Sequence, residues 1–235
     1  PNNMKPKNDT DEIFQLITEK SSLKNEVYNN TLQSFNLIKE VIKNLSSEFT
    51  KYTNSHKSEL PINLVAKPNG KFEIDLKFGG DILLFMMHTN VFEFPRDHDV
   101  MRTQYVKADS TRSYCGIINI YNFLADSFKY NRVNDIGYLI GRIFVNKESH
   151  YFIEGKRELG LLYNDFGKNI ISTETVEPII KAAIKYTVNF DLLTPHYDLI
   201  KFVQVHDMKR TIDSISLQTG KRLGYKFNAD EDSEK

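Results

Sequence analysis

The chain has 235 residues, of which 40% are hydrophobic and 26% are charged, and its 31 basic and 31 acidic side chains give a formal net charge of zero. A chain of this length and composition can bury a substantial core without disulfides or metal ions. The zero net charge argues against a dedicated nucleic-acid-binding protein, because neutralising phosphates requires a surplus of lysine and arginine. The single cysteine, Cys115, excludes an internal disulfide and a thiolate zinc site.

The sequence contains no segment that predicts membrane insertion or export. The longest apolar run, Ile82 to Met87, is far shorter than the roughly 20 residues of a membrane-spanning helix. The first five residues lack the apolar core of a secretory signal. We therefore predict a cytoplasmic protein that does not contact a membrane, and the single cysteine agrees with a reducing compartment.

The first part of the chain has the periodicity of a long helix or of a pair of helices. Its second half carries a heptad seam, which comprises Phe35, Ile38, Ile42, Leu45, Phe49 and Tyr52. An offset seam precedes it, which comprises Ile13, Leu16, Leu23 and Val27. Weak helix formers between the two seams predict either a bend or a break. The heptad seam is compatible with packing on the protein's own sheet and with self-association of the helix, and both remain open from the sequence.

Six later segments have the pattern of β-strands, because they are alternating or continuously apolar and lie between turn-forming residues. They are residues 62–66, 72–78, 82–87, 136–145, 151–154 and 197–206. Helices are predicted over residues 113–130, over 157–166, and from Thr173 or Thr175 to about residue 188. Short links between the strands predict mainly antiparallel pairing. The expected fold is α+β, with helices packed on a mainly antiparallel sheet of about six strands after the long N-terminal helix or helix pair.

These elements divide the chain into three predicted regions. Residues 1–58 form a helical N-terminal segment and residues 59–227 form the α+β domain. Asp207 is predicted to cap a last helix that ends at Gly220. Residues 228–235 are acidic and polar, and we expect them to be disordered.

Histidine and aspartate residues form the first candidate site. The group comprises His88, Asp97, His98 and Asp99, and His206 is a further candidate. Imidazole and carboxylate groups together bind divalent metal ions, so this group predicts a metal site if the side chains converge. The alternative interpretation is a surface loop that is rich in turn-forming residues.

Residues 95–112 form the second candidate site. This polar stretch of about 18 residues has no strong periodicity, as is typical of a functional loop. Its candidates for binding an anionic ligand are Arg96, Arg102, Tyr105, Lys107 and Arg112. Three aspartates in the same stretch offset this positive charge, so a solvated loop is the alternative.

Two weaker patterns complete the list of candidates. Asp75-Leu76-Lys77 resembles the strand signature of metal-dependent nucleases, but the upstream Pro-Asp element is missing and alternating charges on a wet strand face explain the same residues. Cys115 would lie in the first turn of the predicted helix over 113–130, where the helix dipole favours a thiolate. A small packed hydrophobic residue is the alternative role for this cysteine.

Two functions follow from these patterns. The first is a non-catalytic ligand-sensing or protein-interaction module, which self-associates through its N-terminal helix or binds a small molecule. The second is a metal-dependent hydrolase or nuclease that uses the histidine and aspartate group. The sequence has no phosphate-binding loop and no dinucleotide-binding glycine motif, so we expect no cofactor.

Overall fold

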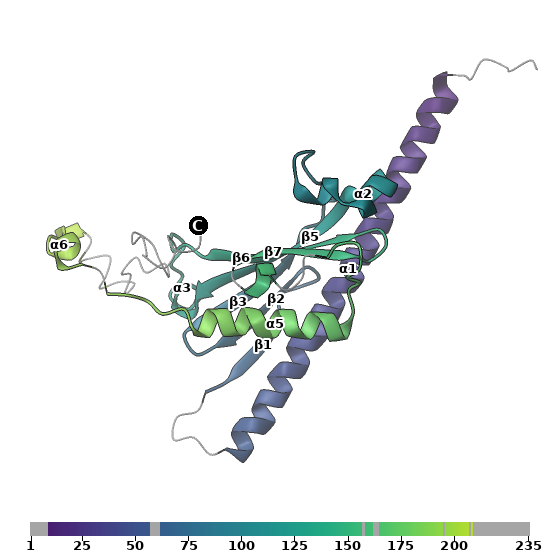
Figure 1. The fold of residues 1–235 in the computed structure, drawn as a ribbon. Helices are drawn as coiled ribbons and strands as arrows, with labels where there is room; N and C mark the ends of the chain where they lie inside the picture. Colours follow the sequence, from purple (N-terminus) through teal and green to yellow (C-terminus); the bar gives the residue numbers. More distant parts are fainter. Residues whose placement is uncertain are drawn as a thin grey trace, which may run out of the picture.

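The computed structural model describes residues 9–56, 62–156, 158–161, 165–194, 196–206 and 208. It has a long N-terminal helix, a sheet whose paired strands are antiparallel throughout the described residues, and further helices that pack on this sheet (Figure 1). The α+β fold predicted from the sequence is therefore confirmed. Within the described part of the chain, no helix combines the length and the apolar content that crossing a membrane requires.

Helix α1 runs without interruption over Asp9–Ser55, so the two predicted seams belong to one helix. Its weak helix formers are accommodated by hydrogen bonds within the helix. Thr31 Oγ1 donates to the Val27 carbonyl at 2.7 Å, and Ser34 Oγ donates to the Asn30 carbonyl at 2.7 Å. Thr31 and Ser34 are also buried against the rest of the protein, and such packing overrides intrinsic helix propensity.

The sheet has seven strands in the described residues, and its order is β1-β2-β3-β5-β6-β7. The bounds are Leu64–Pro68 for β1, Glu73–Phe78 for β2, Asp81–Met87 for β3, Phe92–Glu93 for β4, Tyr114–Leu124 for β5, Tyr138–Asn146 for β6 and Tyr151–Gly155 for β7. The short strand β4 pairs with the beginning of β5, where β3 has already ended. Strand β5 is therefore central, with β3 and β4 along one edge and β6 along the other.

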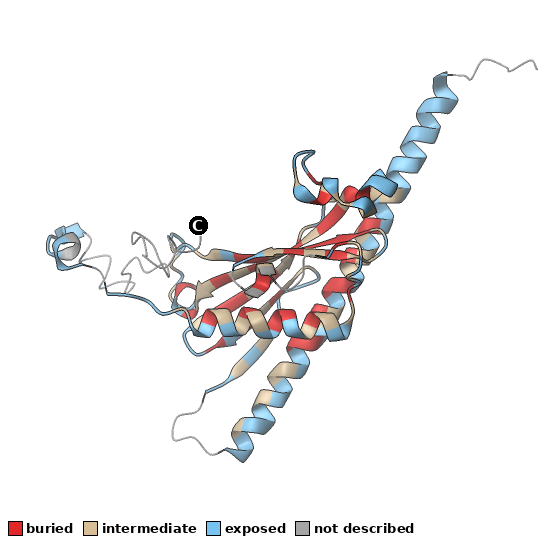
Figure 2. Cartoon of the chain, viewed as in Figure 1, coloured by how far each residue is buried: buried red, intermediate tan, exposed pale blue. Residues whose placement is uncertain are grey.

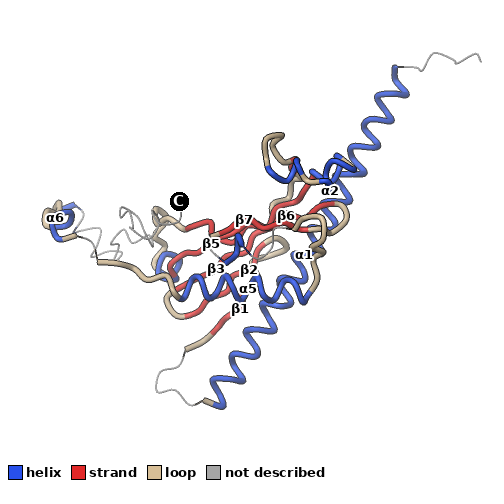
Figure 3. The backbone as a smooth tube through the Cα atoms, in the orientation of Figure 1, coloured by secondary structure: helices blue, strands red, loops and turns tan. Residues whose placement is uncertain are grey.

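Helices α1 and α5 (Thr173–Val188) cover one face of the sheet, and the main core lies beneath them (Figures 2 and 3). Phe35 and Ile38 of α1 belong to the same buried cluster as Leu83 and Ile118 of the sheet. Gly116 permits this close approach, because a Cβ atom at that position would lie 2.7 Å from Thr31 Cβ. The N-terminal helix and the sheet thus share one core.

Residues 92–113, which we call the covering segment, lie over one end of the opposite face of the sheet. The segment contains β4, the 3-10 helix η1 (Asp99–Arg102), the helix α2 (Gln104–Ala108) and the 3-10 helix η2 (Ser110–Ser113). Its apolar residues form a second, smaller core with strand residues and Phe166. This core comprises Phe94, Val100, Val106, Cys115, Phe144 and Phe166. The segment predicted to be a long polar loop is therefore largely ordered in short helices.

The helix predicted over residues 113–130 is wrong. Residues 114–124 are the central strand β5, and only Ala125–Lys129 are helical, as α3. Both faces of β5 are covered at least in part, so apolar residues occur on both faces and the two-residue period is hidden. Asn119 and Asn122 happen to repeat at a helical spacing, although they lie on opposite faces of the strand.

The strand predicted over residues 197–206 is also absent. Tyr197–Ile200 form the short helix α6, and Phe202, Val203 and Val205 are exposed, so none of the described strands provides hydrogen bonds or packing there. The helix predicted over 157–166 is reduced to α4 (Glu158–Leu161) in the described residues. Asp207 and the predicted acidic tail lie outside the described residues.

The cap of α5 differs by one residue from the prediction. Ser172 is the N-cap, because its side chain accepts a hydrogen bond from the Thr175 backbone N–H. The Thr175 hydroxyl accepts one in return from the Ser172 backbone N–H at 2.8 Å. These two hydrogen bonds form a capping box, so Thr175 takes part in the cap without being the N-cap residue.

Candidate ligand-binding pocket

A pocket of about 230 Å³ lies between the covering segment and the open face of the sheet. Its apolar walls come from β4, β5, β6 and the residues after β4, namely Phe92, Phe94, Pro95, Cys115, Ile117 and Phe144. Its polar lining comprises Glu93, His98, Arg142 and Glu154. A concave apolar surface with a few convergent polar groups is the usual form of a small-molecule site.

Strand register places the strand residues of this lining, apart from Glu93, on one face. Phe92 pairs with Cys115 across β4 and β5, and Ile117 pairs with Phe144 across β5 and β6. Arg142 pairs with Glu154 across β6 and β7. Directly paired residues point to the same side of an antiparallel sheet, and residues two apart along a strand do so as well. The pocket floor therefore follows from the pairing of four strands.

Glu154 holds the polar corner of the pocket together. Its Oε1 accepts a hydrogen bond from His98 Nε2 at 2.9 Å, and its Oε2 accepts one from Arg142 Nε at 2.9 Å. Burial opposes ionisation of Glu154, but these hydrogen bonds outweigh burial and lower the pKa of the carboxyl below its usual value. Glu154 is therefore a carboxylate at neutral pH, and it connects the covering segment to β6 and β7.

His98 is fixed in orientation by both of its ring nitrogens. The Val100 backbone N–H donates to His98 Nδ1 at 3.2 Å, so Nε2 carries the proton that is donated to Glu154. The same ring caps helix η1 and packs against Phe94, with the ring centroids 4.7 Å apart. His98 is thus a positioned hydrogen-bond donor, and neither nitrogen has a lone pair free for a metal ion.

A second polar cluster anchors the other end of the covering segment to the turn between β6 and β7. Asn146 is fully buried, and its Nδ2 donates to the Tyr105 hydroxyl at 2.9 Å. The Tyr105 hydroxyl donates to Glu148 Oε2 at 2.7 Å, and Arg112 Nε donates to Glu148 Oε1 at 3.0 Å. Burial and the hydrogen bond to Glu148 raise the pKa of Tyr105. Tyr105 and Arg112 therefore hold the covering segment in place.

An ion pair adds to this anchor. Lys147 Nζ lies 2.6 Å from Asp109 Oδ2, and Asp109 Oδ1 accepts from the Thr111 backbone N–H at 2.9 Å. Hydrogen bonds from Lys147 and Thr111 lower the pKa of Asp109 well below its usual range. Two separate polar clusters, at Glu154 and at residues 146–148, thus fasten the covering segment to the sheet.

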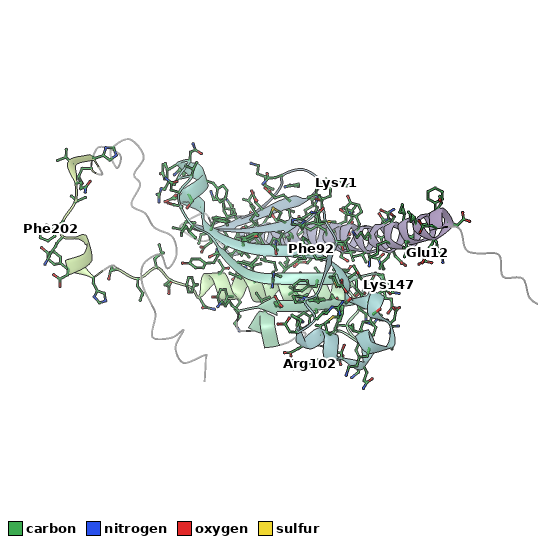
Figure 4. The ribbon with its side chains drawn as sticks, turned by 90° about the horizontal axis from the view of Figure 1, so that it is seen from above. Glu12, Lys71, Phe92, Arg102, Lys147 and Phe202 are labelled. Atoms are coloured by element: carbon green, nitrogen blue, oxygen red, sulfur yellow. The ribbon has the colours of Figure 1, made fainter. Side chains whose placement is uncertain are left out.

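The five predicted anion-binding residues do not line this pocket. Arg96 and Lys107 are exposed, and Arg102 is paired with Asp99 at 3.5 Å on the outer side of the covering segment (Figure 4). Tyr105 and Arg112 stack on each other, with the Arg112 Cζ atom 4.4 Å from the ring centroid. The structure therefore joins two of the five in a structural cluster and leaves the other three on the surface.

The predicted metal ligands are not gathered into a site. In the part of the chain that the structure describes, no three His, Cys, Asp or Glu side chains come together in a way that would hold a metal ion. His98 lines the pocket, whereas His88 Nδ1 accepts a hydrogen bond from the Asn90 backbone N–H at 3.1 Å. Asp97 and Asp99 are exposed, as is His206.

The residues of the predicted oligomer face differ in how far they are buried within this chain. Phe35, Ile38 and Ile42 are fully buried within this chain, so they are not available to a second copy. Leu45 is partly buried against the same core. Phe49 is half-buried and Tyr52 is 56% exposed, with their ring centroids 6.2 Å apart. Most of this seam therefore packs on the protein's own sheet.

The remaining sequence candidates are also placed by the structure. Cys115 lies in a strand, is 1% exposed, and has a pKa that burial raises, so it is not an activated thiolate. Asp75 and Lys77 share one face of β2, as the sequence predicts, but Lys77 is exposed and Asp75 accepts a hydrogen bond from Asn69. Neither position combines with other groups into a described metal site.

Sequence reasoning missed Arg142 and Glu154. Both lie in segments that were correctly predicted as strands with a short link between them, and each is a charged residue among apolar neighbours. Opposite charges at directly paired positions of a predicted hairpin are the signal that would have singled them out. Their connection with His98 had no such signal, because it depends on how the covering segment folds back over the sheet.

Comparisons of the chain with protein-family models, with curated proteins and with solved structures gave no match. The functional argument therefore rests on the geometry of the pocket.

Proposed function

We propose that this chain is a non-catalytic ligand-binding domain, whose pocket takes a small aromatic molecule that carries a hydrogen-bond acceptor. The observation that carries the proposal is the pairing of an apolar hollow with an oriented guanidinium group. The aromatic part of the pocket wall consists of Phe92, Phe94 and Phe144. Arg142 stacks on Phe144, with its Cζ atom 5.1 Å from the ring centroid. Aromatic walls favour flat apolar ligands.

The hydrogen bonds that the polar groups of the pocket already make support a ligand that carries a hydrogen-bond acceptor. Arg142 donates to Glu154 through Nε and Nη2, and among the described residues its Nη1 makes no hydrogen bond. The Arg142 side chain is 40% exposed and lines the pocket. A carboxylate or carbonyl oxygen matches such a fixed donor, and the pairing of Glu154 with Arg142 limits the repulsion of an anion.

The same groups favour binding over catalysis. His98 and Glu154 use each other as hydrogen-bond partners, and Cys115 is protonated and buried. A general base or nucleophile needs an accessible reactive atom within reach of the substrate. The pocket volume of about 230 Å³ is below the roughly 300–1,000 Å³ of pockets for drug-sized ligands, so the proposed ligand is small.

Thermal shift and NMR titration with benzoate, benzamide and benzylamine test this proposal. Benzoate and benzamide carry an acceptor and should raise the melting temperature, since they bind the native state alone. Benzylamine has the same ring but carries a cation, and it should bind more weakly than either. NMR shifts should gather at Ile117, Phe144 and Arg142.

Two matched variants make the test specific. Ile117→Trp fills the pocket and should abolish these shifts, whereas Leu84→Trp places the same side chain on the same open face outside the pocket lining. Equal loss of binding in both variants, or no binding by any of the three probes to the unmodified protein, would refute the proposal.

A further inference from the structure

The N-terminal part of α1 extends beyond the sheet as a free helical arm, which we define as residues 9–26 (Figure 1). Every residue from Asp9 to Ser22 is exposed, and burial begins at Leu23 and Val27. The side chain that ties the arm to the body is Lys20, which donates to the Tyr114 hydroxyl and lies 4.2 Å from the centroid of that ring. Glu12 lies near the outer end of the arm (Figure 4).

The arm carries an apolar stripe that is largely exposed in the described part of the structure. Ile13, Leu16 and Ile17 are 47%, 60% and 57% exposed. Their spacing continues through Lys20 and Leu23 to the buried Val27, so the stripe lies on the same helix face that packs on the sheet further along. An apolar face on a helix is normally buried against another element, so a partner along this stripe would stabilise the arm.

We propose that two copies of the chain associate through these stripes as an antiparallel pair of arms. In the register that we infer, Ile13 of one copy lies level with Leu23 of the other, and Leu16 lies level with Lys20. The aliphatic stem of Lys20 then covers Leu16, while its ammonium group keeps its hydrogen bond to Tyr114 of the same chain. This arrangement is isologous, so each arm gives and receives the same contacts.

Charge complementarity supports the antiparallel direction. The first turn of the arm holds three acids, Asp9, Asp11 and Glu12. The two lysines of the arm, Lys20 and Lys24, lie toward its other end, together with Glu19 and Glu26. In the proposed register Glu12 lies level with Lys24 of the other copy, at both ends of the pair. A parallel pair would instead set the three acids of one copy beside those of the other.

The position of the sheet gives a steric reason for the same direction. From Val27 onward the stripe face of α1 is occupied by the sheet of its own chain. A parallel partner would have to continue along that occupied face, because α1 is one continuous helix. An antiparallel partner overlaps only the arm, which is about 27 Å long at 1.5 Å per residue, and the two sheets lie at opposite ends.

Sedimentation and light scattering on the whole chain measure the association. A seam of little more than two heptads predicts a weak dimer, whose fraction rises with protein concentration. Ile13→Asp/Leu16→Asp should give a monomer at every concentration. Gln15→Asp/Ser22→Asp adds the same charges to exposed positions on the other side of the arm, and it should dimerise like the unmodified chain. Far-UV circular dichroism reports whether the arm remains helical in both variants.

Charge exchange and cysteine cross-linking test the direction. Glu12→Lys and Lys24→Glu should each weaken the dimer, and the double variant should restore it. Ile13→Cys/Leu23→Cys should form a disulfide-linked dimer, whereas Ile13→Cys alone should not, because the two copies of residue 13 lie about 15 Å apart in an antiparallel pair.

Three results would overturn the proposal. They are a chain that stays monomeric at all concentrations, a dimer that survives Ile13→Asp/Leu16→Asp, and a linked dimer from Ile13→Cys alone. None of these outcomes depends on the ligand pocket, so they test the proposed dimer independently of the proposed ligand binding.

Discussion

His98 Nε2 lies 2.9 Å from Glu154 Oε1, although the two residues are 56 positions apart in the chain. This contact joins the covering segment to the edge strand β7, and it closes the polar corner of the candidate pocket. Glu154 also accepts from Arg142, so one carboxylate orients both of the other polar groups in that corner. The stability of the covering segment and the shape of the pocket therefore depend on the same side chain.

Replacing Glu154 with glutamine should destabilise the protein by about 1–2 kcal/mol, because two charge-assisted hydrogen bonds in a partly exposed site are weakened. Urea unfolding at neutral pH measures the change. Asp99→Asn is the matched control, since the Arg102–Asp99 pair is exposed on both sides and should contribute less than about 0.5 kcal/mol. Equal effects of the two substitutions would contradict the role assigned to Glu154.

Acid should destabilise the fold through three carboxylates at the two anchors of the covering segment. Hydrogen bonds lower the pKa values of Asp109, Glu148 and Glu154 in the folded protein. A lowered folded-state pKa means that each group stabilises the fold above its unfolded-state pKa, and that this contribution is lost as the pH falls through the folded-state value. The free energy of unfolding should therefore decrease from about pH 4.5 downward.

Urea unfolding at a series of pH values tests this expectation, and Glu154→Gln should show a shallower decrease than the unmodified chain. Asp75 acts with the opposite sign, because burial raises its pKa and its ionisation near neutral pH disfavours the folded state. Asp75→Asn should therefore make the loss of stability in acid steeper. A stability that does not change between neutral pH and about pH 3 would rule out the assigned pKa shifts.

Gly116→Ala should be strongly destabilising, because the added methyl group would collide with Thr31 of α1. Forcing apart two packed elements in a core typically costs about 1–3 kcal/mol or more. Gly80→Ala is the control, since a Cβ atom there meets nothing within 4 Å. Thermal unfolding of the two variants gives the comparison, and a tolerated Gly116→Ala would mean that α1 does not approach β5 as closely as described.

The Cys115 thiol should not react with iodoacetamide in the native protein at neutral pH. It is 1% exposed and burial raises its pKa, so both access and thiolate formation are suppressed. The same thiol should react readily once the chain is unfolded in guanidinium chloride. Mass spectrometry of the alkylated protein measures both rates. Fast alkylation of the native chain would indicate that the covering segment opens.

Local patterns predicted much of the fold correctly. The alternation of Phe72, Ile74 and Leu76 with charged residues defined β2, and the spacing of Val176, Ile179 and Ile180 defined α5. Each of these elements has one face that is exposed to solvent. Polar residues therefore recur along its sequence with the period of the helix or strand. Strand β5 has no such face, so its residues were interpreted as a helix. At residues 197–206 the strand-like pattern has no partner strand among the described residues, and a local pattern cannot supply one.

The sequence by itself determined the α+β class, the helical character of the N-terminal segment and the absence of thiolate or nucleotide-binding motifs, because these depend on composition and on contacts between near neighbours. Only the tertiary structure decided the site. It paired Arg142 with Glu154 through strand register, and it brought His98 to both by folding residues 92–113 over the sheet. It also assigned Phe35, Ile38 and Ile42 to the protein's own core and left Ile13, Leu16 and Ile17 exposed. The physical reason is that one heptad pattern fits a sheet and a second helix equally well, and only the extent of the sheet determines where along α1 the stripe is already covered.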